Sequence, residues 1–154
     1  MPGAGFYAIH TSKISFRSDG RWYADDDPIL HERLARLFSR YLRRKSDDKW
    51  EIWIDERYHA DVEVEDTPYV ITGVDVDSPG HITIHLNDGT AELLDPSGLR
   101  VGANEVLYCR VKQGNERARF LRPAYYHLVP YLEEPMPGQY ELHCGGQVYS
   151  ITQA

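Results

Sequence analysis

The sequence predicts an α+β protein made of two small lobes. Three observations support this fold class: one amphipathic helical segment stands near the start, many short β-like runs follow it, and Gly, Pro and Asp turn signals separate those runs. The chain has 154 residues, 42% hydrophobic and 27% charged, which are values of globular rather than disordered proteins. Such a length accommodates one domain of average size or two small lobes.

The N-terminal lobe, expected over residues 13–77, opens with a hairpin. Residues 14–18 and 21–24 have strand-like composition, and Asp19-Gly20 stands between them. This dipeptide is the strongest short hairpin signal, because both turn positions need positive φ. We therefore expect the lobe to begin with two antiparallel strands.

A helix is expected next, from about Pro28 to Arg44. An aspartate before Pro28 supplies an N-cap, and proline suits the first helical position because the N–H it lacks would have no partner there. Apolar residues recur at three- and four-residue spacing and predict a stripe that packs on a sheet. They are Leu30, Leu34, Leu37, Phe38, Tyr41 and Leu42.

Two strands with one polar face are expected after the helix. Residues 50–54 alternate apolar and polar positions, and residues 61–65 alternate acid with valine. Asp61, Glu63 and Glu65 then point to one side, where burial would raise at least one carboxylate pKa and create acid and base roles. The alternative is an edge strand that uses exposed charge against aggregation, which we favour.

The C-terminal lobe is expected over residues 78–154 as a β-rich roll or small barrel with one short helix. The segment Ser78-Pro79-Gly80 is the turn at which the lobes are divided. Further turn signals separate several short strands, including a hairpin at residues 106–121 and a closing hairpin at residues 140–151. The helix begins near Pro123.

Several short motifs stand in a fixed order along the chain. They are Asp19-Gly20-Arg21-Trp22, Asp27-Pro28-Ile29, Leu37-Phe38, Asp66-Thr67-Pro68-Tyr69, the late hairpin with Arg119-Phe120-Leu121-Arg122, Tyr126-His127-Leu128-Val129 and Cys144-Gly145-Gly146. Their order and spacing resemble an uncharacterised bacterial family, domain of unknown function 1285. The resemblance extends from Ile14 to Ile151 and implies a two-lobed α+β protein, but it implies no activity.

Bulk chemistry limits the classes of partner. Seventeen Lys and Arg against 24 Asp and Glu leave a net charge of -7, which disfavours nucleic acid as a partner. The chain contains neither an apolar run long enough for a membrane helix nor a secretory signal, so we expect a cytoplasmic protein without membrane partners. Cys109 and Cys144 form no Cys-x-x-Cys pair and are expected to be inert thiols.

No catalytic residue and no cofactor are predicted. The chain lacks the glycine-rich phosphate loops, the Gly-x-Ser-x-Gly nucleophile motif and the His-Glu-x-x-His zinc motif. The best alternative metal site pairs Asp77 with His81 across the turn between them, with Asp75 opposite Thr83. An exposed strand face near a turn explains the same residues more simply, so no metal is assigned.

Aromatic and arginine side chains are the predicted ligand contacts. Trp50 and Trp53 cannot both face the same side of a regular strand, so at least one is expected to be exposed, at an interface or lining a pocket. Packing in the core or between the lobes explains the aromatic residues more simply. Arginines beside aromatic rings near a helix start would form an anion-binding corner. The predicted ligand-binding residues are Trp22, Trp53, Arg119, Arg122 and Tyr126.

Two functions remain open from the sequence. The first, which we favour, is a non-enzymatic binding or interaction module for a small anionic ligand or a partner protein. The second is a metal-assisted hydrolase that uses a His/Asp cluster around Asp77 and His81 to activate water. The many short strands also leave open a homodimer formed by strand or helix pairing.

Overall fold

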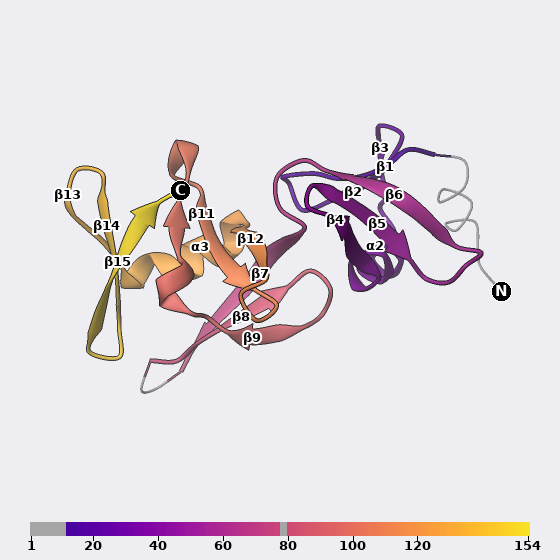
Figure 1. Ribbon diagram of the computed structural model, residues 1–154. Coiled ribbons are helices and arrows are strands. Elements are labelled where there is room, and N and C mark those ends of the chain that lie inside the picture. Colours follow the sequence, from indigo (N-terminus) through magenta and orange to yellow (C-terminus); the bar gives the residue numbers. More distant parts are fainter. Residues whose placement is uncertain (1–11, 78–79) are drawn as a thin grey trace. The chain divides into compact units, whose positions relative to one another are not determined.

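A computed structural model describes residues 12–77 and 80–154 and divides the chain into two compact units (Figure 1). The N-terminal unit is Met1–Pro68 and the C-terminal unit is Tyr69–Ala154. The sequence placed the division at residue 78 instead. The difference arises from one strand, β7 (Tyr69–Val76), whose hydrogen-bonded neighbours β8 and β12 both belong to the C-terminal sheet.

The N-terminal unit contains one helix and a six-stranded sheet. The helix is α2 (Glu32–Arg40), and the strand order is β3-β2-β1-β6-β5-β4. Only the β1–β6 pair is parallel; the other neighbours are antiparallel. The strands are β1 (Ile14–Phe16), β2 (Trp22–Ala24), β3 (Asp27–Pro28), β4 (Leu42–Ser46), β5 (Lys49–Trp53) and β6 (His59–Val64).

The predicted opening hairpin is confirmed. Strands β1 and β2 pair antiparallel, with Phe16 opposite Trp22. Gly20 adopts a φ of 79°, and its N–H donates to the carbonyl of Arg17 at 2.9 Å. Glycine adopts this left-handed conformation without the Cβ clash that other residues meet, which explains why the turn forms at this position.

The predicted helix exists but is shorter at both ends. Pro28 lies in β3, and His31 caps the helix by accepting a hydrogen bond at Nδ1 from the N–H of Leu34 at 3.2 Å. At the other end the chain leaves the helix at Tyr41, and Leu42 begins β4 opposite Ile52. Leu42 is buried in β4, and a helix that continued to this residue would also have buried it. The spacing of apolar residues therefore did not distinguish a longer helix from a strand at this position.

The expectation that the acidic strand lies at a sheet edge was wrong. Strand β6 lies between β1 and β5. Because side chains alternate across a strand, its acids all reach one face of the sheet while Val62 is buried on the other. An antiparallel sheet tolerates one solvated face, so an interior strand can carry these charges.

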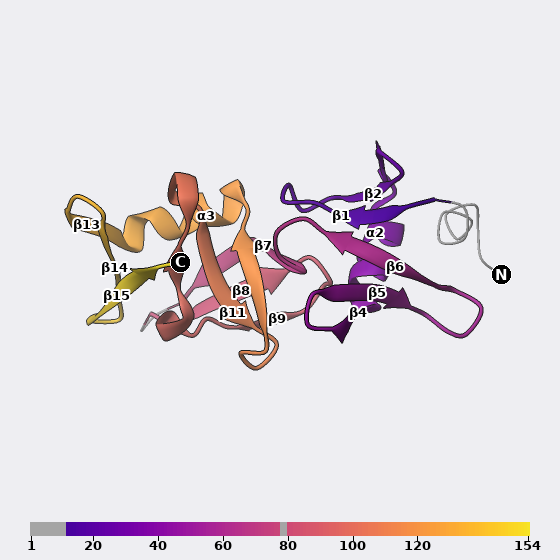
Figure 2. The same ribbon diagram turned by 45° about the horizontal axis from the view of Figure 1, so that its top comes forward.

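The core of the N-terminal unit lies on the face covered by α2. Trp22 contacts Phe16 and Phe38 with ring centroids at 4.9 and 5.6 Å, which joins the hairpin to the helix. The indole N–H of Trp22 donates to Ser39 Oγ at 2.9 Å, so its polar atom is satisfied inside the core. Figure 2 shows α2 beside the strands it covers.

The C-terminal unit is a nine-stranded sheet with one short helix. Its order is β13-β14-β15-β10-β11-β12-β7-β8-β9, and β7–β12 and β10–β15 are the parallel pairs. The helix α3 (Arg122–Leu128) buries Ala124 and Leu128 in the core, and it has Pro123 in its first turn as predicted. The further strands are β8 (Ile82–Leu86), β9 (Ala91–Leu93), β10 (Arg100–Val101), β11 (Leu107–Val111), β12 (Glu116–Phe120), β13 (Leu132–Met136), β14 (Gln139–Cys144) and β15 (Gln147–Gln153).

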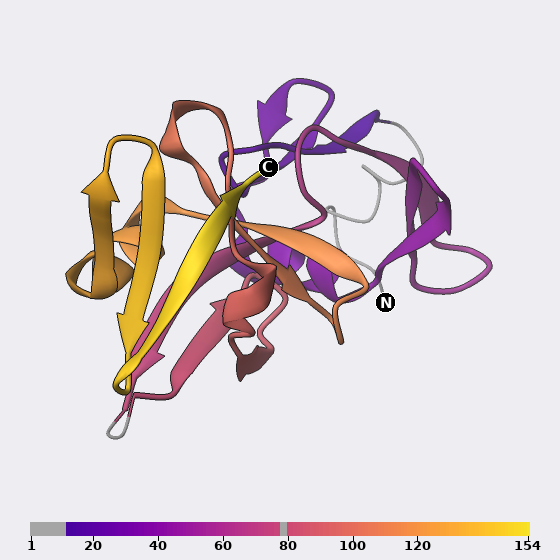
Figure 3. The same ribbon diagram turned by 60° about the vertical axis from the view of Figure 1, so that its left-hand side comes forward.

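The α+β class and both C-terminal hairpins are confirmed, whereas the alternative of a closed barrel is not. Strands β11 and β12 pair antiparallel, as do β14 and β15, which Figure 3 shows as neighbouring ribbons. The sheet of the described residues is open, because its terminal strands β13 and β9 each have a single neighbour. No helix in the described part of the chain is long and apolar enough to cross a membrane.

Candidate functional site

The predicted ligand-binding residues are divided between the two units. Trp22 and Trp53 lie in the N-terminal unit. Arg119, Arg122 and Tyr126 lie in the C-terminal unit, the first on β12 and the other two on α3.

Trp22 was expected to contact ligand, but it is a core residue. Only 1% of its surface is exposed, and its neighbours Phe16, Phe38 and Ser39 occupy its rings and its N–H. A side chain with this burial stabilises the unit by packing rather than by binding.

Trp53 is half-buried and lies on the face of β5 opposite that of the buried Trp50, as the alternation predicted. The guanidinium of Arg43 lies 4.5 Å from its ring centroid, and the imidazole of His59 stacks on it at 4.5 Å. These two residues belong to the strands on either side of β5. Protein groups therefore already cover much of the ring that a ligand was expected to contact.

The predicted anion-binding corner is spread over a strand and a helix. Arg119 alternates with the buried Ala118 and Phe120, so its side chain lies on the outer face of β12. Arg122 and Tyr126 are exposed on α3, and Tyr126 has 61% of its surface accessible.

The residues of the alternative metal site pair locally. Asp77 accepts a hydrogen bond from the N–H of His81 at 2.9 Å, and its carboxylate lies 3.6 Å from the imidazole. A second pair joins His85 Nε2 to Asp75 at 2.6 Å, and Asp75 is opposite Thr83 as predicted. Within residues 12–77 and 80–154, no group of three or more His, Cys, Asp or Glu side chains could hold one ion.

The two cysteines are free, and their surroundings keep both thiols protonated. Burial, and then the nearby charge of Glu92, raises the pKa of Cys109 to about 12. Burial and the charge of Asp77 also raise the pKa of Cys144, whose thiol donates to the carbonyl of Gly80 at 2.8 Å. Thiols react as thiolates, so neither group is activated as a nucleophile.

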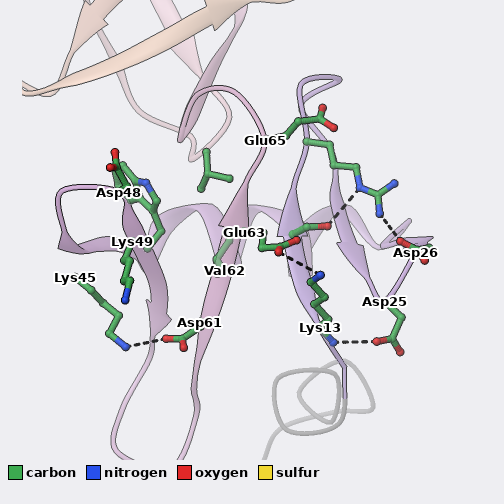
Figure 4. A pocket seen from close by; sticks show the side chains of 14 residues that line it. Lys13, Asp25, Asp26, Lys45, Asp48, Lys49, Asp61, Val62, Glu63 and Glu65 are labelled. Carbon is green, nitrogen blue, oxygen red and sulfur yellow. Dashed lines mark hydrogen bonds and ion pairs between the residues drawn. The ribbon is translucent and has the colours of Figure 1, made fainter.

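A cavity of the N-terminal unit includes the solvated face of strands β1 and β6. Ser15 of β1 and Glu63 of β6 are register partners and lie on this face. Figure 4 shows Glu63 beside Lys13 in the cavity. The cavity measures about 670 Å³ and is called the charged basin below. Its lining residues are Lys13, Ser15, Arg17, Asp25, Asp26, Lys45, Asp48, Lys49, Trp50, Asp61, Val62, Glu63, Val64 and Glu65.

Ion pairs cross the charged basin between strands. Lys45 of β4 lies 2.9 Å from Asp61 of β6, and Lys13 lies 3.2 Å from Glu63, as the dashed lines of Figure 4 show. At the β2 end, Arg17 binds Asp26 at 2.8 Å. The pairs are held by side chains from four different strands or their ends, so the register of the sheet determines them.

Hydrogen bonds lower the pKa of two carboxylates of the basin. A hydrogen bond from Lys45, and then its charge, hold the pKa of Asp61 below its ordinary value. Hydrogen bonds from Ser18, first from its backbone N–H, likewise lower the pKa of Glu65. The basin therefore has six carboxylates against four cationic side chains, and its excess charge is negative.

The sequence predicted three of the six carboxylates of the basin. The alternation of Asp61, Glu63 and Glu65 correctly placed three acids on one face. It missed Lys13 and Lys45, which lie far from these acids in the sequence. The sequence shows only that these two lysines stand beside or within predicted strands. Their carboxylate partners can be identified only when the order of the strands in the sheet is known.

Comparisons with known proteins give a family match over the N-terminal part of the chain and a fold for the whole of it. Residues 8–67 match the model of the N-terminal domain of a family described as a domain of unknown function, DUF1285. A crystal structure of a DUF1285 family protein from Silicibacter pomeroyi DSS-3 is similar over 100% of this chain and 91% of its own, with 20% identity and a TM-score of 0.69. One from Shewanella baltica OS155 covers 78% of this chain and 92% of its own, with 20% identity and a TM-score of 0.59. No curated protein matches the chain.

Proposed function

We propose that this protein, whose residues 8–67 match the DUF1285 N-terminal domain, is a non-enzymatic binding module. It shares its fold with two DUF1285 family proteins. The charged basin is its binding surface, and its partner is a basic segment of another protein. The single observation that supports this proposal is the cavity of about 670 Å³ with its excess of carboxylates over cationic side chains.

The chemistry of the basin favours a protein segment over a small ligand. Small-molecule sites of this volume are mostly apolar and bury most of the ligand. In this basin the side chains of Asp26, Asp61 and Glu63 are largely exposed, so a small ligand would remain hydrated. A polypeptide that lies across the strands can instead make several exposed polar contacts at once.

The sign of the charge favours a basic partner. The carboxylates outnumber the cationic side chains, and a partner lysine or arginine can exchange with the lysines that now hold Asp61 and Glu63. Such complementary charges raise the association rate and select among partners. The basin has an excess of negative charge, which would repel the small anionic ligand considered from the sequence.

The proposal predicts that two neutral substitutions in the basin weaken the binding of a basic peptide. For the double variant Asp61→Asn/Glu63→Gln we expect affinity for hexalysine to fall about fivefold, because two negative charges are lost and the lysines paired with them are left as unpaired positive charges in the basin. Isothermal titration calorimetry at low ionic strength measures this change.

A matched variant separates the basin from the general acidity of the protein. Glu32→Gln/Glu56→Gln removes the same charge from exposed positions of the N-terminal unit outside the basin. It is expected to change the affinity by less than about twofold. Equal losses in the two double variants would show that hexalysine responds only to net charge, and the proposal would then fail.

A further inference from the structure

Four of the arginines in the C-terminal unit lie on one face of three neighbouring strands. Tyr108 of β11 is opposite Arg100 of β10 on one side and Arg119 of β12 on the other, and Arg110 of β11 is opposite Arg117 of β12. Register partners point to the same side, and all five residues alternate with core residues. This arginine face consists of Arg100, Tyr108, Arg110, Arg117 and Arg119.

This concentration of positive charge is unusual for its unit. Residues 69–154 contain ten Asp and Glu but only six Lys and Arg, and four of those six lie on the arginine face. Among the residues that the structure describes, no ion pair joins Arg100, Arg110 or Arg117 to a carboxylate. The acids of the unit therefore leave these three guanidinium groups without a neutralising partner.

The arrangement also works against the stability of the sheet. Arg110 and Arg117 are directly opposite each other on β11 and β12. Like charges in this position repel and destabilise the strand pair. A binding partner that supplies negative charge would offset the repulsion, so the pair is explained by function better than by folding.

Close packing holds the arginine face in shape. A Cβ on Gly102 would lie 2.8 Å from Tyr108 Cε2, and one on Gly98 would lie 3.2 Å from Cβ and Cγ of Arg110. Glycine therefore allows two loops to press against these side chains. The guanidinium of Arg117 lies 4.6 Å from the Tyr108 ring centroid, which orients it over the face.

We infer that the arginine face binds an acidic, extended segment of a partner protein. Arg110 and Arg117 form one row, and Arg119 with Arg100 forms a second row two residues away along the strands. Arg100 Nη1 donates to the carbonyls of Ser97 and Leu99 at 2.9 and 2.7 Å, which leaves its other guanidinium nitrogens to face a partner. The separation between the two rows is about 6.7 Å, the distance between alternate side chains of an extended peptide. A segment with carboxylates at alternate positions would place one against each row, where guanidinium forks bind carboxylates through paired hydrogen bonds.

Nucleic acid fits this face less well than an acidic peptide. Arg117 already covers the ring of Tyr108, the one aromatic side chain among the five residues, so the face offers no free ring for base stacking. The net charge of -7 also repels a long phosphate backbone, whereas a short acidic segment meets only the local field of the arginines. The surface belongs to the C-terminal unit and is independent of the charged basin.

The test is a fluorescence anisotropy titration of the full chain with two labelled octapeptides of equal composition. One alternates glutamate with serine, and the other has four glutamates followed by four serines. We expect Arg110→Gln/Arg117→Gln to weaken binding of the alternating peptide about tenfold. We also expect the unsubstituted protein to prefer the alternating peptide over the block peptide.

The control variant Arg33→Gln/Arg36→Gln removes two exposed arginines from α2 and should bind like the unsubstituted protein. Thermal unfolding completes the test: Arg110→Gln/Arg117→Gln should fold with an unchanged or higher Tm, because it removes a repulsion. Equal binding by the two double variants would overturn the inference. Tighter binding of a thymidine oligonucleotide than of the alternating peptide of equal charge would also overturn it. Self-association of the protein that the Arg110→Gln/Arg117→Gln substitutions abolish would overturn it as well.

Discussion

Replacing Lys112 with methionine is expected to lower the free energy of unfolding of the C-terminal unit by about 3 kcal/mol, because it leaves a buried carboxylate without its counter-charge. Lys112 Nζ lies 2.6 Å from Asp88 Oδ2 and 3.2 Å from Thr90 Oγ1. The side chain of Asp88 is 6% exposed and that of Lys112 is 30% exposed. The ammonium also lies 5.0 Å from the ring centroid of Tyr69.

Two further variants isolate the cause. Lys112→Met/Asp88→Asn removes both charges and is expected to recover part of the loss, since no unpaired charge remains. Lys45→Met breaks an exposed pair of similar length with Asp61 and should lower stability by less than about 1 kcal/mol. Equal losses for Lys112→Met and Lys45→Met would contradict the assignment of Asp88 as a buried charge.

The same pair makes the C-terminal unit sensitive to acid. Burial alone would raise the pKa of Asp88, but hydrogen bonds from Lys112 and Thr90 outweigh it and hold the pKa below the ordinary value of 3.8. A carboxylate with a lowered folded pKa contributes stability above its unfolded pKa and loses it as pH falls through the folded one. Urea unfolding between about pH 5 and pH 2 should show a steeper loss for the unsubstituted protein than for Lys112→Met/Asp88→Asn.

Replacing Trp22 with alanine is expected to lower the free energy of unfolding of the N-terminal unit by about 3–5 kcal/mol. The substitution opens a cavity between Phe16 and Phe38 and leaves Ser39 Oγ without its indole donor. A loss of this size approaches the whole stability of a small domain, so the unit should be largely unfolded at 37 °C.

Tryptophan fluorescence during urea unfolding measures this effect. All three tryptophans of the chain lie in the N-terminal unit, so Trp50 and Trp53 still report on it after the substitution. The C-terminal unit is followed in parallel by hydrogen exchange. Trp53→Ala is the matched control and should lower stability by only about 1 kcal/mol, because Trp53 packs against Arg43 and His59 on the solvated face. An unchanged unfolding midpoint for Trp22→Ala would refute its place in the core.

Local chemistry explains why some elements could be predicted and others could not. The turn at Asp19-Gly20 forms because of a backbone conformation that its own glycine allows, so its hairpin was predictable. The end of helix α2 depends instead on the pairing of Leu42 with Ile52, a contact between separate strands. A buried leucine is compatible with the end of an amphipathic helix and with the start of a strand. Only the pairing with a partner strand determines which of the two forms.

The two proposed binding surfaces show the same division. Alternation along β6 placed Asp61, Glu63 and Glu65 on one face without any knowledge of the fold. The lysines that pair with two of these acids come from β4 and from the start of β1, so the basin exists only because of the order β1-β6-β5-β4. Arg119 was singled out beside Arg122 and Tyr126, whereas its register partner is Tyr108.

The sequence by itself determined the α+β class, the turns and the approximate strands, because each depends on the alternation, spacing or turn chemistry of residues near one another in the chain. The tertiary structure alone decided that Trp22 is a core residue, that the acidic strand is interior and that four arginines share one face. Those outcomes depend on strand order and register, which arise from contacts between distant segments and from the burial that they produce.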